Sequence, residues 1–166
     1  MAVPFLILFT YKNVTADREV IESYRSDDRK ISTQLVNELE NNEIVIATDL
    51  SFSTFKFYFS RLNKNGINFK LIAYPAEIAT HPGWKHLSEM LGNKEKYKQE
   101  STALTNQLKN DKYKKIYVLY KYENPVNEIL REDLDKKFNF VKEEIPLAPR
   151  EPSWFDSILI YKPLDT

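Results

Sequence analysis

Short apolar segments alternate along this chain with segments of helical period, and this alternation constrains the fold more than any other sequence feature. A strand buried on both sides is indicated by the run Glu43-Ile-Val-Ile-Ala-Thr-Asp49. The next segment repeats Phe52, Phe55, Phe59 and Leu62 at spacings of three and four, which predicts a helix with one buried face. By the same criteria we expect strands at 3–11, 43–49, 68–74 and 115–122, and helices at 29–41, 51–62, 94–109 and from residue 125.

Alternation of this kind predicts βαβ units around a mostly parallel sheet. Right-handed crossovers would place helices on both faces of that sheet. The last two strands, expected at 138–145 and 155–162, have no helix between them and should form an antiparallel hairpin at one edge. A length of 166 residues suits one domain. The sequence therefore predicts a single α/β domain over residues 1–166, three-layered and Rossmann-like.

The residue types that the chain lacks exclude several chemistries. The absence of cysteine rules out disulfides, thiolate metal sites, iron–sulfur clusters and cysteine nucleophiles. The three glycines, Gly66, Gly83 and Gly92, are too scattered to build a glycine-rich phosphate loop. A Gly-x-Ser-x-Gly elbow is also missing, which disfavours a serine hydrolase. We expect no cofactor and no metal.

The charge balance argues against nucleic acid as a partner. Twenty-four basic residues balance twenty-four acidic ones, so a broad positive footprint is not expected. Aromatic strands can stack single-stranded nucleic acid, and Tyr117, Tyr120 and Tyr122 lie on one predicted strand. Without a basic excess, packing in the sheet is the better explanation of these tyrosines.

The beginning of the chain carries no recognisable targeting segment. Its longest apolar run, Phe5-Leu-Ile-Leu-Phe9, is far shorter than the about 20 apolar residues of a membrane helix. No basic region precedes it and no small-residue cleavage site follows it, so a signal peptide is not expected. A core strand so close to the first residue favours a fragment of a longer protein, with Met1-Ala2 as an expression scar.

The first candidate ligand site is the end of the strand at 43–49. Ligands of open α/β sheets bind beyond the carboxyl ends of the strands. Asp49 and Ser51 lie at such an end, just before a helix N-terminus that could hold an anion or a sugar hydroxyl. Helix capping explains the same two residues and is the commoner role of Asp and Ser at this place.

The second candidate site follows the strand at 68–74. Glu77 and His81 are spaced to share a turn, and a carboxylate that orients an imidazole recurs in catalysis. Trp84 could stack on the face of a sugar. Two histidines and one glutamate, without a second acidic motif, are weak evidence for a zinc site. The structural alternative, which is the commoner one, is a loop packed by Trp84 with His86 exposed.

Five motifs, taken together, have a pattern that is known from one protein family. They are Ile44-Val-Ile-Ala-Thr-Asp49, Phe55-Lys-Phe-Tyr58-Phe59, Tyr74-Pro-Ala-Glu77, His81-Pro-Gly-Trp84 and Ile116-Tyr-Val-Leu-Tyr120. This combination, which covers most of the chain, resembles the soluble C-terminal domain of polytopic membrane glycosyltransferases. These enzymes are similar to dolichyl-phosphate-mannose protein mannosyltransferases and aminoarabinose transferases.

The resemblance implies an α/β domain that follows a multi-helix membrane part, on the outer face of the cell membrane. It places a tyrosine of the aromatic helix at Tyr58. The acids credited with catalysis in that family lie in loops between membrane helices, which this chain does not contain. The resemblance therefore implies a non-catalytic domain that assists acceptor or sugar recognition, with a glycan and the membrane part of its parent protein as partners.

Two alternatives remain open. One is a free-standing, cytoplasmic Rossmann-like enzyme or nucleotide-sugar-binding protein that uses Asp49, Ser51, Glu77 and His81. The other is a protein-interaction domain whose exposed aromatic side chains form a docking face.

Overall fold

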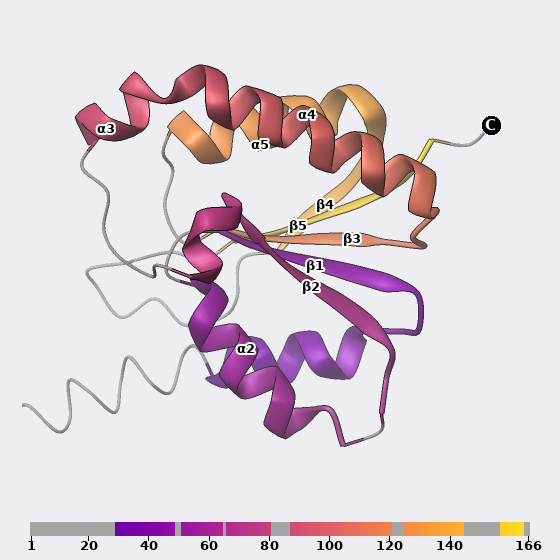
Figure 1. Ribbon diagram of the computed structural model, residues 1–166. Helices are drawn as coiled ribbons and strands as arrows, with labels where there is room; N and C mark the ends of the chain where they lie inside the picture. The colour runs from indigo at the N-terminus through magenta and orange to yellow at the C-terminus, as the bar shows by residue number, and fades with distance from the viewer. Residues whose placement is uncertain are drawn as a thin grey trace, which may run out of the picture.

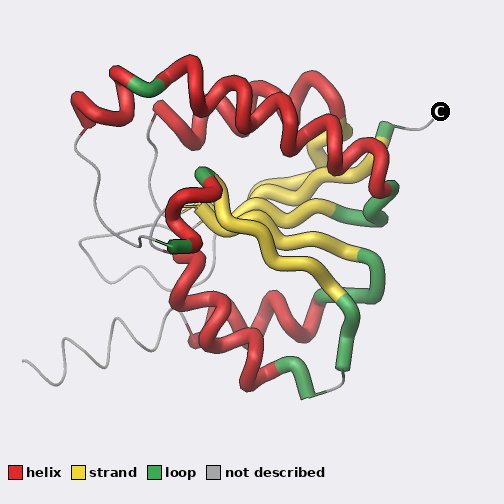
Figure 2. The backbone as a smooth tube through the Cα atoms, in the orientation of Figure 1, coloured by secondary structure: helices red, strands yellow, loops and turns green. Residues whose placement is uncertain are grey.

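A computed structural model describes residues 29–48, 51–64, 66–80, 87–120, 125–144 and 157–164. Its centre is a five-stranded sheet in the order β2-β1-β3-β5-β4 (Figures 1 and 2). The predicted strand at 3–11 lies outside the described residues. The strands are β1 (Glu43–Thr48), β2 (Phe69–Tyr74), β3 (Ile116–Tyr120), β4 (Phe138–Glu144) and β5 (Ser157–Pro163).

Helices cover both faces of the sheet, which confirms the α/β class. A helix over 29–38 and α2 (Ser51–Leu62) lie on one face, and α4 (Lys94–Asp111) and α5 (Pro125–Lys137) lie on the other (Figure 1). A short 3-10 helix, η1 (Ala76–Ala79), follows β2, and α3 (Leu87–Gly92) precedes α4. Within the described ranges, no helix combines the length and apolar character needed to cross a membrane.

The sheet is mixed, so the expectation of a mostly parallel sheet is only partly confirmed. β1 pairs in parallel with β2 and with β3, whereas β5 is antiparallel to both β3 and β4. β4 therefore runs in the same direction as β1, β2 and β3. The predicted hairpin is confirmed with β4 at the edge, but its second strand fills the place between β3 and β4.

The continuous apolar run of β1 is explained by burial on both faces. Ile44 and Ile46 pack under α4 and α5, while Val45 and Ala47 pack under α2 and the helix over 29–38. All four are fully buried. Burying a large aliphatic side chain contributes about 1.5–3 kcal/mol, so β1 anchors both layers at once.

The predicted buried face of α2 is confirmed for Phe52, Phe55 and Phe59, while Leu62 at the helix end is partly buried. The buried side of α4 consists of Tyr97, Ser101, Leu104, Thr105 and Leu108, and that of α5 of Val126, Asn127, Ile129, Leu130 and Leu134. The helix predicted to end at residue 41 ends at 38. Gly66 has a positive φ of 64° and lies in the loop beyond the end of α2.

Polar side chains link α4 to α5 above the apolar layer. Asp133 Oδ2 accepts hydrogen bonds from the hydroxyls of Ser101 and Thr102, at 2.9 and 3.1 Å. Lys137 Nζ donates to Thr105 Oγ1 and Asn106 Oδ1, at 2.7 and 2.8 Å. These contacts fix the two helices in register on one face of the sheet.

Candidate functional site

The strand order reverses between β1 and β3, and their carboxyl ends mark the place where α/β sheets commonly bind ligands. From β1 the chain enters α2 on one face, and α5, the next helix after β3, lies on the opposite face. The predicted site around Asp49 and Ser51 is at this edge. Asp49 itself lies outside the described residues.

The described hydroxyls at this edge serve the fold. Thr48 Oγ1 donates to the carbonyl oxygen of Leu119 at 2.8 Å, which joins β1 to β3. Ser51 Oγ donates to the carbonyl oxygen of Thr48. Both side chains are buried. Ser51 therefore bonds the first residue of α2 to the end of β1, and Thr48, which the sequence analysis did not single out, bonds β1 to β3.

Glu77 lies at the same edge, in η1, and its carboxylate is directed toward α4. Oε1 accepts a hydrogen bond from Tyr97 Oη at 2.9 Å, and Oε2 forms an ion pair with Lys96 Nζ at 2.7 Å. The backbone N–H of Ala76 donates to Glu100 on the same helix. These contacts hold the segment after β2 against α4. His81 lies outside the described residues, so the expected pairing of Glu77 with His81 stays a prediction.

Tyr74, the last residue of β2, completes this junction. Its hydroxyl donates to the carbonyl oxygen of Tyr97 at 3.2 Å, and its side chain is fully buried. Burial, followed by the negative charge of Glu100, raises the pKa of Tyr74 above its ordinary value. Tyr74 is therefore a neutral hydrogen-bond donor and not a candidate base.

Of the remaining predicted ligand residues, Tyr58 lies within the described residues. Tyr58 is half-buried on α2, with its ring edge-to-face against that of Phe57 at a centroid distance of 5.3 Å. Trp84 lies outside the described residues. The backbone positions of Ser51 and Glu77 share one edge of the sheet. The Ser51 hydroxyl bonds to the end of β1, whereas the Glu77 carboxylate bonds to α4 on the other face. Among the described residues, the predicted candidates form no common cluster.

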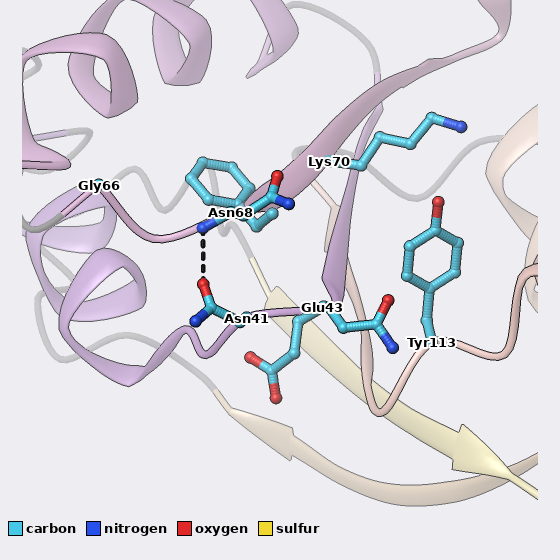
Figure 3. A pocket seen from close by; sticks show the side chains of 8 residues that line it. Asn41, Glu43, Gly66, Asn68, Lys70 and Tyr113 are labelled. Atoms are coloured by element: carbon cyan, nitrogen blue, oxygen red, sulfur yellow. Dashed lines mark hydrogen bonds between the residues drawn. The ribbon is translucent and has the colours of Figure 1, made fainter.

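A hollow of about 810 Å³ lies at the opposite edge, by the amino ends of β1 and β2 (Figure 3). Asn41 Oδ1 accepts the backbone N–H of Asn68 there at 2.8 Å, and Asn42 Nδ2 donates to the carbonyl of Lys112 at 3.3 Å. These amides bind neighbouring turns to each other. The hollow is lined by Asn41, Asn42, Glu43, Gly66, Asn68, Phe69, Lys70 and Tyr113.

Glu43 contributes a buried carboxylate to this edge, and Figure 3 shows it pointing away from Lys70 and Tyr113. Its Oε2 accepts the backbone N–H of Glu40 at 2.7 Å, and its Oε1 lies 3.1 Å from Lys115 Nζ. The sequence analysis missed this hollow. The signal available was the density of asparagines at 41, 42, 63, 65 and 68, which is equally typical of turns.

The chemistry available to the described residues is limited. They contain no group of three or more His, Asp or Glu side chains that could hold a metal ion. The buried hydroxyls of Ser51 and Thr48 are hydrogen-bonded to backbone carbonyl oxygens of the sheet. Comparison with protein-family models and with curated proteins finds no match for this chain.

Proposed function

We propose that this chain is a non-catalytic domain of a membrane-bound glycosyltransferase, which assists recognition of the sugar or the acceptor. The observation that carries the non-catalytic part is the bonding of Glu77. The sequence analysis assigned this carboxylate to a catalytic pair in which it would orient His81, and both of its oxygens are engaged by Lys96 and Tyr97.

Catalytic use of these residues would carry a structural cost. A general base must reach the proton that it removes, at about 2.6–3.2 Å. Turning Glu77 away from α4 would break its ion pair and its hydrogen bond with Tyr97 together. Ser51 is buried, so its hydroxyl does not face solvent for attack on a substrate. These features favour a scaffolding role for both residues.

The glycosyltransferase part of the proposal rests on the sequence resemblance. The same resemblance puts the domain on the outer face of the membrane, beside the membrane part of its parent protein. The runner-up is the Rossmann-like enzyme or nucleotide-sugar-binding protein, whose residues Asp49 and His81 lie outside the described ranges.

The upstream coding sequence tests the glycosyltransferase proposal directly. We expect several apolar stretches of about 20 residues, each long enough to span a membrane, in the reading frame before this segment. A native translation start at Met1 would refute the proposal. A full-length protein with such stretches but without sugar transfer from lipid-linked donors would refute it as well.

The exposed edge of β4 favours a second candidate function, protein interaction. Among the described strands, β4 is the last in the sheet order, and Phe140 and Val141 on it are 48% and 43% exposed. An exposed edge strand can pair with a strand of another chain. Val141→Lys should then abolish self-association or partner capture. A wild-type chain that is monomeric and captures nothing would dismiss this candidate.

A further inference from the structure

One face of α2 is exposed, basic and partly aromatic. Its exposed side chains recur at helical spacing, so they form one stripe opposite the phenylalanines that enter the core. At the centre of the stripe, Phe57 is 50% exposed. We call this stripe the outer face of α2; it consists of Ser53, Lys56, Phe57, Ser60 and Arg61, with Lys64 just beyond the helix end.

Positive charge is concentrated in this layer of the fold. Residues 50–76 contain no aspartate or glutamate. The helix over 29–38 and α2 together carry four basic residues and one acid, Glu38. By contrast, α4 and α5 on the other face of the sheet carry seven basic and seven acidic residues. Among the described residues, the helix over 29–38 and α2 therefore form a basic layer, on the face of the sheet opposite α4 and α5 (Figure 1).

The described residues provide no counter-ion for the cations of the outer face. Lys56, Arg61 and Lys64 form no ion pair with any described residue. The ion pairs between described residues all lie elsewhere, for example Lys96 with Glu77 and Lys98 with Glu95. Within the part of the chain that the structure describes, the charge of the outer face therefore remains available to an external anion.

We propose that the outer face of α2 docks on a bilayer that contains anionic phospholipids. Basic side chains beside an exposed aromatic ring suit the headgroup region, where the cations meet phosphates and the ring reaches the acyl boundary. The proposal uses only the charge and exposure of α2, so it stands or falls separately from the glycosyltransferase assignment.

Single-stranded nucleic acid fits this face less well. Base recognition without sequence preference relies on stacking against open aromatic rings. The guanidinium carbon of Arg61 lies 3.6 Å from the centroid of the Phe57 ring, so one face of that ring is already covered. Tyr58 meets the same ring edge-to-face. Contact with a bilayer does not require a free ring face, because the apolar edge of the Phe57 ring can enter the acyl boundary.

Vesicle co-sedimentation of the full 166-residue chain tests the proposal. We expect binding to vesicles of phosphatidylcholine mixed with phosphatidylglycerol, and little binding to phosphatidylcholine alone. Lys56→Gln combined with Arg61→Gln should weaken binding about 25-fold, because each cation near an anionic surface contributes roughly a factor of five. Phe57→Ser should weaken it about fivefold through loss of apolar contact. Added salt should reduce binding by the wild type.

The matched control is Lys94→Gln combined with Lys109→Gln, which removes two exposed cations from α4 on the opposite layer. This variant should bind as the wild type does, and circular dichroism should show that all variants fold. Several outcomes would overturn the proposal: no vesicle binding by the wild type, equal losses in the control, or binding that survives the α2 variant. Binding of polyuridylate that depends on Lys56 and Arg61, without vesicle binding, would overturn it in favour of nucleic acid.

Discussion

Lys115 Nζ lies 3.1 Å from Glu43 Oε1, and the two partners differ sharply in exposure: the lysine side chain is 30% exposed and the glutamate 0%. Glu43 also accepts the backbone N–H of Glu40. The Lys115 ammonium can therefore be hydrated if its partner is removed, whereas the buried Glu43 carboxylate cannot. This asymmetry makes the pair a sensitive test of the structure at the amino ends of β1 and β3.

Lys115→Met should destabilise the fold far more than Glu43→Gln. The first change leaves a buried carboxylate without its cation, at a cost of about 3–5 kcal/mol. The second keeps an oxygen for the N–H of Glu40 and should cost about 1 kcal/mol. Urea unfolding measures the free energy of unfolding of both variants. The control is Lys109→Met on the exposed surface of α4, whose free energy of unfolding should lie within about 0.5 kcal/mol of wild type. Equal losses in the two test variants would contradict the structure.

Stability should fall in alkaline solution because two buried tyrosines resist ionisation. Burial, followed by the charge of Glu43, raises the pKa of Tyr117 to about 12, and burial also raises the pKa of Tyr74. The fold favours the neutral phenols. Their contribution to stability is therefore complete below about pH 10, the ordinary tyrosine pKa, and is lost as the pH rises through the folded-state value.

Lys115 adds to this alkaline loss. Burial alone would lower the pKa of Lys115, but the Glu43 carboxylate and the Tyr117 oxygen raise it, and the net shift is upward. Urea midpoints measured across the alkaline range should fall steeply for wild type and less steeply for Tyr117→Phe. An unchanged slope in that variant would show that the Tyr117 phenol is not the group responsible.

Asp133→Ala should loosen α4 from α5. The change removes the acceptor of the Ser101 and Thr102 hydroxyls, and Ser101 is fully buried. Hydrogen bonds to a charged group contribute about 1.5–3 kcal/mol, so we expect a loss near 2 kcal/mol. In thermal unfolding, this loss should lower the Tm by about 4–8 °C. Thr102→Ala, at an exposed position, should cost less than half as much; a larger effect there would contradict this assignment.

Glu77 and Tyr97 should be coupled in stability. Glu77→Ala, Tyr97→Phe and the double variant form a cycle in which the hydrogen bond of 2.9 Å is removed from either side, since alanine has no acceptor oxygen. We expect a coupling of about 0.5–1.5 kcal/mol in urea unfolding. Glu95→Gln combined with Tyr97→Phe is the control, since Glu95 pairs with Lys98 instead. Strict additivity of Glu77 and Tyr97 would mean that Glu77 is not held against α4 in solution.

The described strands and helices were predictable wherever burial is local in sequence. The continuous apolar run 44–47 predicts the buried strand β1. The phenylalanines of α2 recur at helical spacing and predict that helix. The place of β5 between β3 and β4 was not predictable, because strand order depends on packing between distant segments.

The candidate site was predictable only as a set of positions. The end of β1 and the start of η1 do share one edge of the sheet, since β1 and β2 pair in parallel from Glu43↔Phe69 to Thr48↔Tyr74. Side-chain direction was not predictable. The bonds from Lys96 and Tyr97 that turn Glu77 toward α4 join residues about twenty positions apart in the chain, which no local pattern encodes.

The most direct test of a non-catalytic role is turnover of activated sugar donors by the purified chain, measured for wild type and Glu77→Gln. We predict no turnover above the buffer background in either protein, together with a lower unfolding midpoint for Glu77→Gln. Turnover by wild type that Glu77→Gln abolishes, while the variant keeps the wild-type midpoint, would contradict this account and establish Glu77 as a catalytic residue.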